Sequence, residues 1–431
     1  MRVCVLGLWH LGSVISACMA SKGHKVLGID RNLRNIKNLN NNKAPIFEPG
    51  LDELIKKGLR SKKLIFTNDK KKANSAEILW IAFDTPVDEN DNAVVFIVEE
   101  QIKKIMPHLK KNVVILFSSQ LPVGTIRKMQ EFSKKNFMKK NFKFACSPEN
   151  LRLGNALNTF LNPDRVIIGF DDKRTKNLLS LLFKPITSQI EWMKIESAEM
   201  TKHTINSFLA TSIIFANEIA SICEKVGADY IEVEKGLKSD NRIGHKAYLS
   251  AGNPIAGGTL LRDVNFLNKE KKKFSLSSPL LSSIIISNEK HKKWISKKLL
   301  EEFKTLSNIS ITVWGLTYKP YTDSLRRSLS VELCDWLIKQ HAKIQVYDPV
   351  VKKLPKHWER KIKKNNNPLD SIKNSDVLIV GTFWPEFKKF TNKIQKISKK
   401  KLIIIDPGNN LKIKTFKSNL RYITFGCLPK N

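Results

Sequence analysis

The chain has 431 residues, which exceeds what one compact core holds, so we expect two or three domains. Its formal net charge is +35 at pH 7. The lysines are spread in short pieces along the whole sequence, which is typical of a compositional bias and argues against a specific nucleic-acid surface.

Membrane and metal sites are not expected. We find no run of about 18 apolar residues and no leader with charged and apolar parts, so the sequence predicts neither a membrane span nor a signal peptide. The six cysteines are scattered without a C-x-x-C pair. They indicate reduced core thiols in a cytoplasmic protein with no metal site.

Residues 2–30 have the pattern of a dinucleotide-binding βαβ unit. A short β-branched strand ends at Gly7, and Gly12 lets the following helix approach the sheet. The usual motif has three glycines, and Trp9 stands in place of the second. Asp30 follows the next strand, where an acid accepts ribose hydroxyls and repels a 2′-phosphate. This favours NAD over NADP; the alternative is an ordinary βαβ turn with an acid after it.

From residue 1 to about 190, short apolar runs alternate with helical segments, which predicts a parallel sheet buried on both faces. The expected strands are 2–6, 25–29, 64–66, 78–82, 113–117, 142–145 and 165–168. Residues 195–226 then carry apolar side chains at helical spacing. A helix of this length exceeds the average globular helix and indicates a span between domains or a contact with a second subunit. We therefore expect a two-fold homodimer.

A second unit of similar design occupies residues 309–348. Its first strand ends at Gly315, a long helix follows, and the next strand ends at Asp348. The loop between them carries Lys319 and Arg326 in place of further glycines. Basic groups beside a helix N-terminus suit a phosphate. Two nucleotide-type units indicate two nucleotides, one a cofactor and one the carrier of a substrate.

Several segments together resemble the UDP-glucose/GDP-mannose dehydrogenase family, whose members oxidise the sugar of a nucleotide sugar with NAD. Their order and spacing along nearly the whole chain make the resemblance specific. The matching pieces are PIFEPGLDEL at 45–54, LPVGT at 121–125, SPENLRLGNAL at 147–157, NPDRVIIG at 162–169, SAEMTKHTINSFLATSIIFANEIA at 197–220, NRIG at 241–244, AGGTLLRD at 256–263, GLTYKPYTDSLRRS at 315–328, VYDP at 346–349 and DVLIVGTFWPEF at 376–387.

The resemblance implies an α/β fold with two Rossmann-like doubly wound domains joined by a helical central domain. It places an NAD-binding domain at 1–190, a helical dimerisation domain at 191–300 and a domain for the UDP or GDP part at 301–431. It also implies that the substrate is a nucleotide sugar, with a UDP-sugar favoured.

One feature of the family is missing. In the family a cysteine in a G-G-[ST]-C-x-x-K-D segment captures the aldehyde intermediate, because a tetrahedral adduct is a better hydride donor than a free aldehyde. The segment AGGTLLRD has no cysteine and is one residue shorter, so Thr259 or Leu260 takes the nucleophile position, and Arg262 replaces the lysine. Cys146 lies near the expected site and reads as a core thiol at a strand end.

The resemblance also assigns residues to roles. The expected catalytic residues are Lys202, Asn206, Asp263 and Glu149. The expected cofactor-binding residues are Gly7, Trp9, His10, Leu11, Gly12, Asp30, Thr85 and Ser119. The expected substrate-binding residues are Leu151, Arg152, Arg242, Tyr248, Gly257, Gly258, Thr259, Lys319 and Arg326, with Arg242 reaching across the dimer.

Lys202 and Asn206 are four residues apart, so a helix places both on one face, where both can reach one oxygen. Plain alternatives exist: a solvated lysine beside a helix asparagine, turn chemistry at Glu149 and helix capping at Asp263.

Three functions follow from these observations. The first is oxidation of a nucleotide sugar by two electrons without a cysteine nucleophile. The second is the full four-electron oxidation to the uronic acid through a gem-diol. The third is a non-catalytic protein that binds NAD and a nucleotide sugar. The retained nucleotide units and the Lys202–Asn206 pair favour an enzyme.

Overall fold

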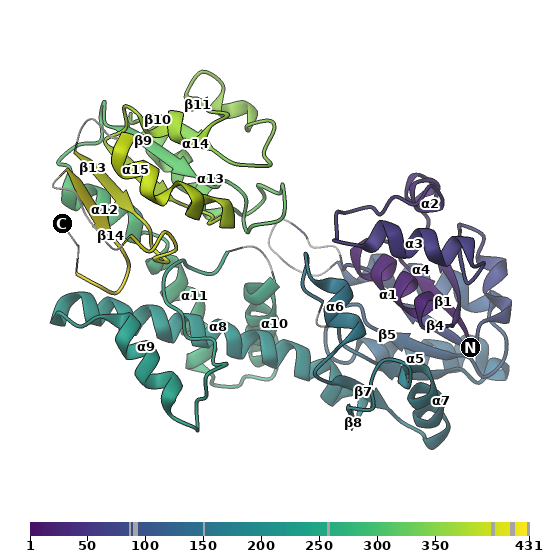
Figure 1. Ribbon diagram of the computed structural model, residues 1–431. Helices are drawn as coiled ribbons and strands as arrows, with labels where there is room; N and C mark the ends of the chain where they lie inside the picture. Colours follow the sequence, from purple (N-terminus) through teal and green to yellow (C-terminus); the bar gives the residue numbers. More distant parts are fainter. Residues whose placement is uncertain are drawn as a thin grey trace. The chain divides into compact units, whose positions relative to one another are not determined.

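The computed structural model describes residues 1–85, 88, 94–149, 151–256, 259–397, 401–413 and 419–428. The chain divides into two compact units, 1–204 and 205–431. Figure 1 colours the chain from purple at its start to yellow at its end. The three-domain boundaries at about 190 and 300 stay a prediction.

The first unit is built on an eight-stranded sheet in the order β3-β2-β1-β4-β5-β6-β7-β8. Neighbouring strands are parallel except for the antiparallel pair β6 and β7. Chain order reverses between β1 and β4, and ligands of such sheets bind beyond the carboxyl ends of the strands at this switch point. The strands are β1 (Arg2–Leu6), β2 (Lys25–Ile29), β3 (Leu64–Thr67), β4 (Ile78–Ile81), β5 (Val114–Phe117), β6 (Lys143–Cys146), β7 (Val166–Phe170) and β8 (Ile190–Met193).

Helices cover this sheet because its strands are apolar on both faces; β4 and β5 are buried at every position. Helix α1 is buried from Leu11 to Ala20 and packs against α3 and α6 (Figure 1). The helices of this unit are α1 (His10–Ser21), α2 (Leu33–Asn40), α3 (Leu51–Arg60), α4 (Val95–Ile105), α5 (Thr125–Phe137), α6 (Ala156–Leu161) and α7 (Lys173–Phe183), with 3-10 helices η1 (Lys70–Ser75), η2 (Met106–His108) and η3 (Met138–Lys140).

The long helix α8 runs from Ile195 to Val226, as the apolar spacing predicts, and crosses the boundary between the two units. By length and composition alone it could cross a membrane, and 39% of its most apolar window is buried. A core helix of a soluble protein passes the same test, so one such helix is weak support for a membrane span.

The second unit holds a six-stranded parallel sheet in the order β11-β10-β9-β12-β13-β14, with a switch point between β9 and β12. The strands are β9 (Ser310–Trp314), β10 (Lys343–Tyr347), β11 (Ile362–Lys364), β12 (Val377–Val380), β13 (Leu402–Ile405) and β14 (Leu420–Ile423). The helices are α9 (Tyr230–Ser239), α10 (Thr259–Lys273), α11 (Pro279–His291), α12 (Trp294–Glu302), α13 (Leu329–Lys339), α14 (Pro368–Ile372) and α15 (Thr391–Ile397), with η4 (Lys356–Trp358) and η5 (Pro385–Phe390).

The predicted fold class is confirmed: two Rossmann-like doubly wound sheets with helical segments between them. Apolar runs at 376–380 and 402–405 predict β12 and β13, whereas the sequence pattern misses β8, β11 and β14. β8 and β11 are short edge strands that are only partly buried, so they lack the continuous apolar run that marks the central strands.

Candidate active site

The turn between β1 and α1 is shaped as a cradle for a dinucleotide. Gly7 has φ +94°, and a Cβ on Gly12 would lie 1.7 Å from the Gly7 carbonyl oxygen, so only glycine allows this close approach. Trp9 precedes the helix with φ −76°, which any residue adopts, and its side chain is 46% exposed. The side chain of Trp9 therefore extends toward solvent, and the close approach of Gly12 to the Gly7 carbonyl is retained.

Asp30 lies at the end of β2, beside this turn. Its Oδ2 accepts from the Leu8 N–H at 2.7 Å, and its Oδ1 accepts from the Asn32 N–H at 2.8 Å. A carboxylate can accept about four hydrogen bonds, and Asp30 is half-buried rather than closed off. Its carboxylate keeps the capacity to accept from ribose hydroxyls.

Asp348 has the same position in the second unit, but it accepts more backbone hydrogen bonds than Asp30 does. Its Oδ2 accepts from the N–H groups of Leu316 and Thr317 at 2.7 and 3.3 Å, and its Oδ1 from those of Val350 and Val351 at 2.9 and 3.1 Å. Four backbone donors fill a carboxylate, and Asp348 is buried. The geometry of the acid thus fits a dinucleotide ribose in the first unit and not in the second.

Thr85 and Ser119 join the ends of β4 and β5. The Phe83 N–H donates to Ser119 Oγ at 2.7 Å, and Thr85 Oγ1 donates to the Gln120 carbonyl at 2.8 Å. Both predicted cofactor residues therefore fix the backbone at the carboxyl edge of the sheet. Ser119 Oγ accepts here and Thr85 Oγ1 donates, so each hydroxyl keeps further hydrogen-bonding capacity.

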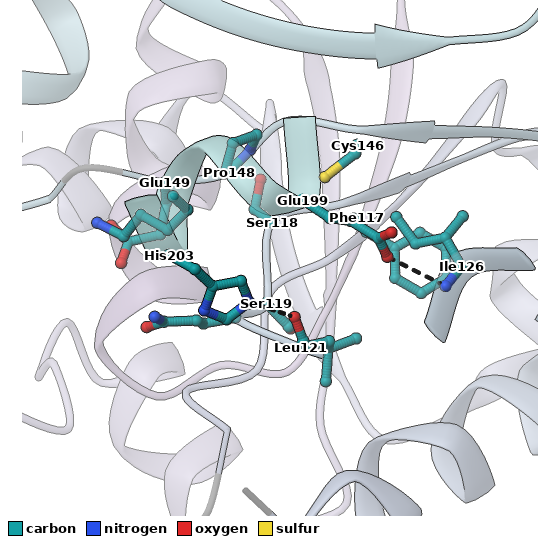
Figure 2. A pocket seen from close by; sticks show the side chains of 12 residues that line it. Phe117, Ser118, Ser119, Leu121, Ile126, Cys146, Pro148, Glu149, Glu199 and His203 are labelled. Carbon is teal, nitrogen blue, oxygen red and sulfur yellow. Dashed lines mark hydrogen bonds between the residues drawn. The ribbon is translucent and has the colours of Figure 1, made fainter. Parts of the chain in front are cut away.

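A small cavity of about 20 Å³ lies beside this edge and brings together Glu149 and Lys202, two of the predicted catalytic residues. Figure 2 shows the side chains that line it, from the ends of β5 and β6, the start of α5 and the first turns of α8. Glu149 Oε2 accepts from the Leu151 N–H at 2.5 Å, which is the turn chemistry of the plain alternative. The hydrogen bond of this turn involves Oε2 and not Oε1 of Glu149.

Two buried groups of α8 complete this cavity. Glu199 accepts from the N–H groups of Gly124 and Ile126 at 2.8 and 3.2 Å, so it caps the N-terminus of α5 (Figure 2). Burial is the largest cause that raises the pKa of the Glu199 carboxyl above its ordinary value. His203 bonds the Leu121 carbonyl at 3.1 Å. Both side chains hold the loop of the LPVGT segment against α8.

Cys146 also lines the cavity, as a buried thiol. Burial, followed by the nearby charge of Glu199, raises the pKa of this thiol well above its ordinary value. A thiol held neutral is a poor nucleophile, which fits a core thiol at a strand end.

Asn206 and Asp263 meet in the second unit. Asn206 on α8 donates from Nδ2 to Asp263 Oδ2 at 2.5 Å, and Asp263 on α10 is fully buried. Thr259 opens α10 one turn before Asp263 and is exposed, whereas Leu260 packs into an apolar cluster. The predicted substrate residues Gly257 and Gly258 lie outside the described residues.

A large cavity of about 630 Å³ opens at the switch point of the second sheet. It is lined by the loops after β9 and β12 and by the start of α13, including Lys319, Thr382 and Ser330. The side chain of Lys319 lies 5.6 Å from the Tyr318 ring centroid. Arg326 is exposed and is not among the described residues that line this cavity.

The remaining predicted substrate residues are more open. Leu151 packs against the first core, and Arg152 is exposed. Arg242 forms an ion pair with Asp240 at 2.7 Å and its side chain is 90% exposed, and Tyr248 is 59% exposed. Arg152, Arg242 and Tyr248 lie at the surface. A second subunit or another covering segment would be needed to enclose a substrate that contacts them.

Sequence reasoning missed two carboxylates. Glu48 is buried, accepts from the N–H groups of Gly154 and Ala156 at 2.9 and 2.8 Å, and bonds His10 at 2.9 Å. Asp84 Oδ2 accepts from the Leu11 N–H at 3.1 Å, so both predicted cofactor residues, His10 and Leu11, contact an acid. The sequence signals were Glu48 within PIFEPGLDEL and an acid, Asp84, in the loop after a strand.

Among the described residues no group of three or more His, Cys, Asp or Glu side chains could hold a metal ion.

Three family models match successive parts of the chain. The NAD binding domain of the UDP-glucose/GDP-mannose dehydrogenase family matches residues 1–187, its central domain 196–290 and its UDP binding domain 312–413.

Relatives and solved structures agree with these matches. The UDP-glucose 6-dehydrogenase YwqF of Bacillus subtilis is 33% identical over 90% of this chain and 89% of its own length. The UDP-glucose 6-dehydrogenase of Rickettsia bellii is 33% identical over 99% of both chains. Among solved structures, a UDP-glucose dehydrogenase from Pyrobaculum islandicum has a TM-score of 0.85 and 25% identity over 97% of both chains. The UDP-D-ManNAc dehydrogenase from Pyrococcus horikoshii has a TM-score of 0.85 and 25% identity over 99% of both chains.

Proposed function

The chain belongs to the UDP-glucose/GDP-mannose dehydrogenase family, and from this premise we propose that it removes two electrons from the sugar of a UDP-sugar. It is an NAD-dependent oxidoreductase that acts on a CH–OH group of a nucleotide sugar. What we propose beyond this activity is the number of electrons removed, the kind of sugar nucleotide and the catalytic residues.

The N-terminus of α1 and Asp30 are proposed to hold NAD. The glycine contact at Gly7 and Gly12 brings the helix end close to the sheet, and Asp30 retains acceptor capacity for the ribose. When bound, NAD supplies the hydride acceptor. The chain's own part is to hold the cofactor at the carboxyl edge of β1 and β4.

The 630 Å³ cavity of the second unit is proposed to take the nucleotide of the substrate. It lies at the switch point of a doubly wound sheet, where such folds bind ligands, and Lys319 supplies a positive charge there. The UDP binding domain of the family covers this part of the chain, which supports uridine diphosphate over other carriers.

The proposed chemistry uses Lys202, Asn206 and Asp263, with Glu149 handling a proton. An ammonium and an amide on one face of α8 can stabilise an alkoxide or a polarised carbonyl oxygen. Asp263 holds the Asn206 amide at 2.5 Å, which leaves the second N–H of that amide to donate to the sugar oxygen. Such groups support one reversible hydride transfer between an alcohol and NAD.

One observation carries the two-electron proposal. Segment 256–263 contains no cysteine, and all six cysteines of the chain are buried and free. Cys146, the thiol beside the Glu149–Lys202 cavity, is held neutral because burial raises its pKa. No thiolate is therefore positioned to form the covalent adduct that a second hydride transfer uses in the family.

We further propose a cytoplasmic homodimer that pairs through α8. Large apolar side chains are exposed at every seventh position of the helix: Phe208 is 69%, Phe215 46% and Ile222 56% exposed. An apolar stripe of this kind on a surface helix is typical of a protein–protein contact. In this dimer Arg242, which is exposed and paired with Asp240, is proposed to reach the site of the other subunit.

The deciding experiment is NADH production from a panel of UDP-sugars, with the product identified by mass. One NADH per sugar and an aldehyde or ketone product would support the proposal. Two NADH per sugar, with a uronic acid as product, would establish the four-electron route instead. No NADH from any nucleotide sugar, with retained binding of NAD, would point to the non-catalytic alternative.

A further inference from the structure

Asp84 lies in the loop after β4, three residues beyond its last residue Ile81, at the edge where β1 and β4 meet. Its Oδ2 accepts from the Leu11 N–H at 3.1 Å, and Leu11 is in the first turn of α1. The helix itself offers no anion there, because its first turn holds no acid and Trp9 makes no side-chain capping bond. Asp84 therefore places a carboxyl group at this helix end.

A helix N-terminus binds anions because its first N–H groups lack helical partners and its dipole is positive there. In dinucleotide-binding folds this position belongs to the pyrophosphate. A carboxylate bonded to the Leu11 N–H occupies one of the donors that a phosphate oxygen would use.

We propose that Asp84 competes with the pyrophosphate of NAD for the N-terminus of α1 and thereby sets the affinity of the protein for its cofactor. NAD binds when Asp84 is protonated or turns away from Leu11. This inference rests on the proposed placement of NAD at α1. A protonated Asp84 can instead donate its O–H to a phosphate oxygen, so the same side chain opposes or assists binding according to its charge.

The surroundings of Asp84 favour its neutral form. Burial is the largest cause that raises its pKa, and the nearby charge of Glu149 raises it further, whereas the Leu11 N–H and His10 lower it. The charged groups that face it are therefore His10 from α1 and Glu149 from the loop after β6. His10 is in turn bonded to the buried Glu48 at 2.9 Å.

The sign of the effect follows from these groups. Below the pKa of folded Asp84 the side chain is neutral and does not repel the pyrophosphate. Above that pKa the carboxylate is charged and faces two phosphate charges in a poorly solvated place. The dissociation constant of NAD should therefore rise with pH through the titration of Asp84.

The test is calorimetric titration of the whole protein with NAD across a range of pH, comparing the wild type with Asp84→Asn. The asparagine keeps an oxygen that accepts from Leu11 but carries no charge. We expect the variant to bind NAD roughly tenfold more tightly at the alkaline end of the range, with the difference shrinking as the pH falls. Because His10 and Glu149 remain, the pH dependence that the variant loses belongs to Asp84.

Glu53→Gln is the matched control, since Glu53 is an exposed acid in the first turn of α3. It should leave the dissociation constant of NAD and its pH dependence unchanged. Asp84→Ser, with a smaller acceptor oxygen, repeats the measurement with the same expected sign, and thermal unfolding without NAD identifies any variant that does not fold.

Two results are separable. If the wild type binds NAD but the folded Asn and Ser variants bind it equally or more weakly at every pH, Asp84 does not compete and this inference is overturned alone. If neither the wild type nor any folded variant binds NAD at any pH, the proposed placement of the cofactor fails as well.

Discussion

The amide of Asn206 donates to the carboxylate of Asp263 at 2.5 Å, and both side chains are buried. They come from α8 and α10, far apart in the sequence, and a charged acceptor makes this a strong bond. The bond fixes which way the amide of Asn206 faces. Replacing either residue is therefore expected to disturb the position of the other.

Asp263→Ala should remove the carboxylate that orients the amide of Asn206. We expect kcat with the active UDP-sugar to fall at least about a hundredfold. The free energy of unfolding should drop by about 1–3 kcal/mol, because the Asn206 amide loses its buried partner. A double-mutant cycle with Asn206→Ala checks the coupling. If the two losses of activity simply add, the residues act independently.

Lys202→Ala should nearly abolish oxidation of the nucleotide sugar while leaving NAD binding intact, because the lost ammonium stabilises charge on the sugar oxygen. NADH release is the readout for activity, and calorimetry is the readout for binding. Lys225→Ala, an exposed lysine in the last turn of the same helix, is the control and should retain activity. Retained activity in Lys202→Ala would remove this lysine from the proposed chemistry.

Asp30→Ala should weaken NAD more than NADP, because the carboxylate accepts from the ribose of NAD and repels a 2′-phosphate. The dissociation constants of both cofactors for the wild type and the variant provide the measurement. A wild type that uses NADP as well as NAD would show that Asp30 does not select the cofactor.

Alkylation of cysteine under native conditions should leave the activity largely unchanged. All six thiols are buried, and burial raises the pKa of Cys18 to about 12 and that of Cys427 to about 11. Thiolates are the reactive form, so little reagent should couple. Activity after iodoacetamide, with the labelled sites counted by mass, checks this. Rapid loss of activity with one labelled cysteine would identify a catalytic thiol.

Phe215→Glu should break the proposed homodimer, since it puts a charge in the middle of the exposed apolar stripe of α8. Light scattering should show the wild type at twice the mass of the variant. Leu181→Glu, at an apolar position on α7 that is 60% exposed, should remain at the wild-type mass. A monomeric wild type would also leave Arg242 without a route to a second subunit.

The parts of the site that sequence predicts are the local ones. Gly7, Gly12 and Asp30 are separated by a strand, a turn and a helix, so their spacing alone indicates the cradle that the structure contains. The same holds for the length of α8, because apolar periodicity is a property of one segment.

The missed parts depend on contacts between distant segments. Glu48 meets Gly154 and Ala156 more than a hundred residues away, and Asp84 meets Leu11 across 73 residues. Periodicity within a window carries no information on such pairs. The edge strand β11 was missed for a related reason, because it is only three residues long and its alignment with β10 defines it.

Asp348 shows how a protein built from two copies of one nucleotide-binding design can give them different ligands without changing the visible pattern. Glycine, helix and terminal acid recur in both units, but four backbone N–H groups surround Asp348 and two surround Asp30. The carboxylate of Asp348 stabilises its own loop through these backbone hydrogen bonds. Engineering a dinucleotide preference into that copy would first require opening the loop at Val350 and Val351, and transplanting glycines alone would not create it.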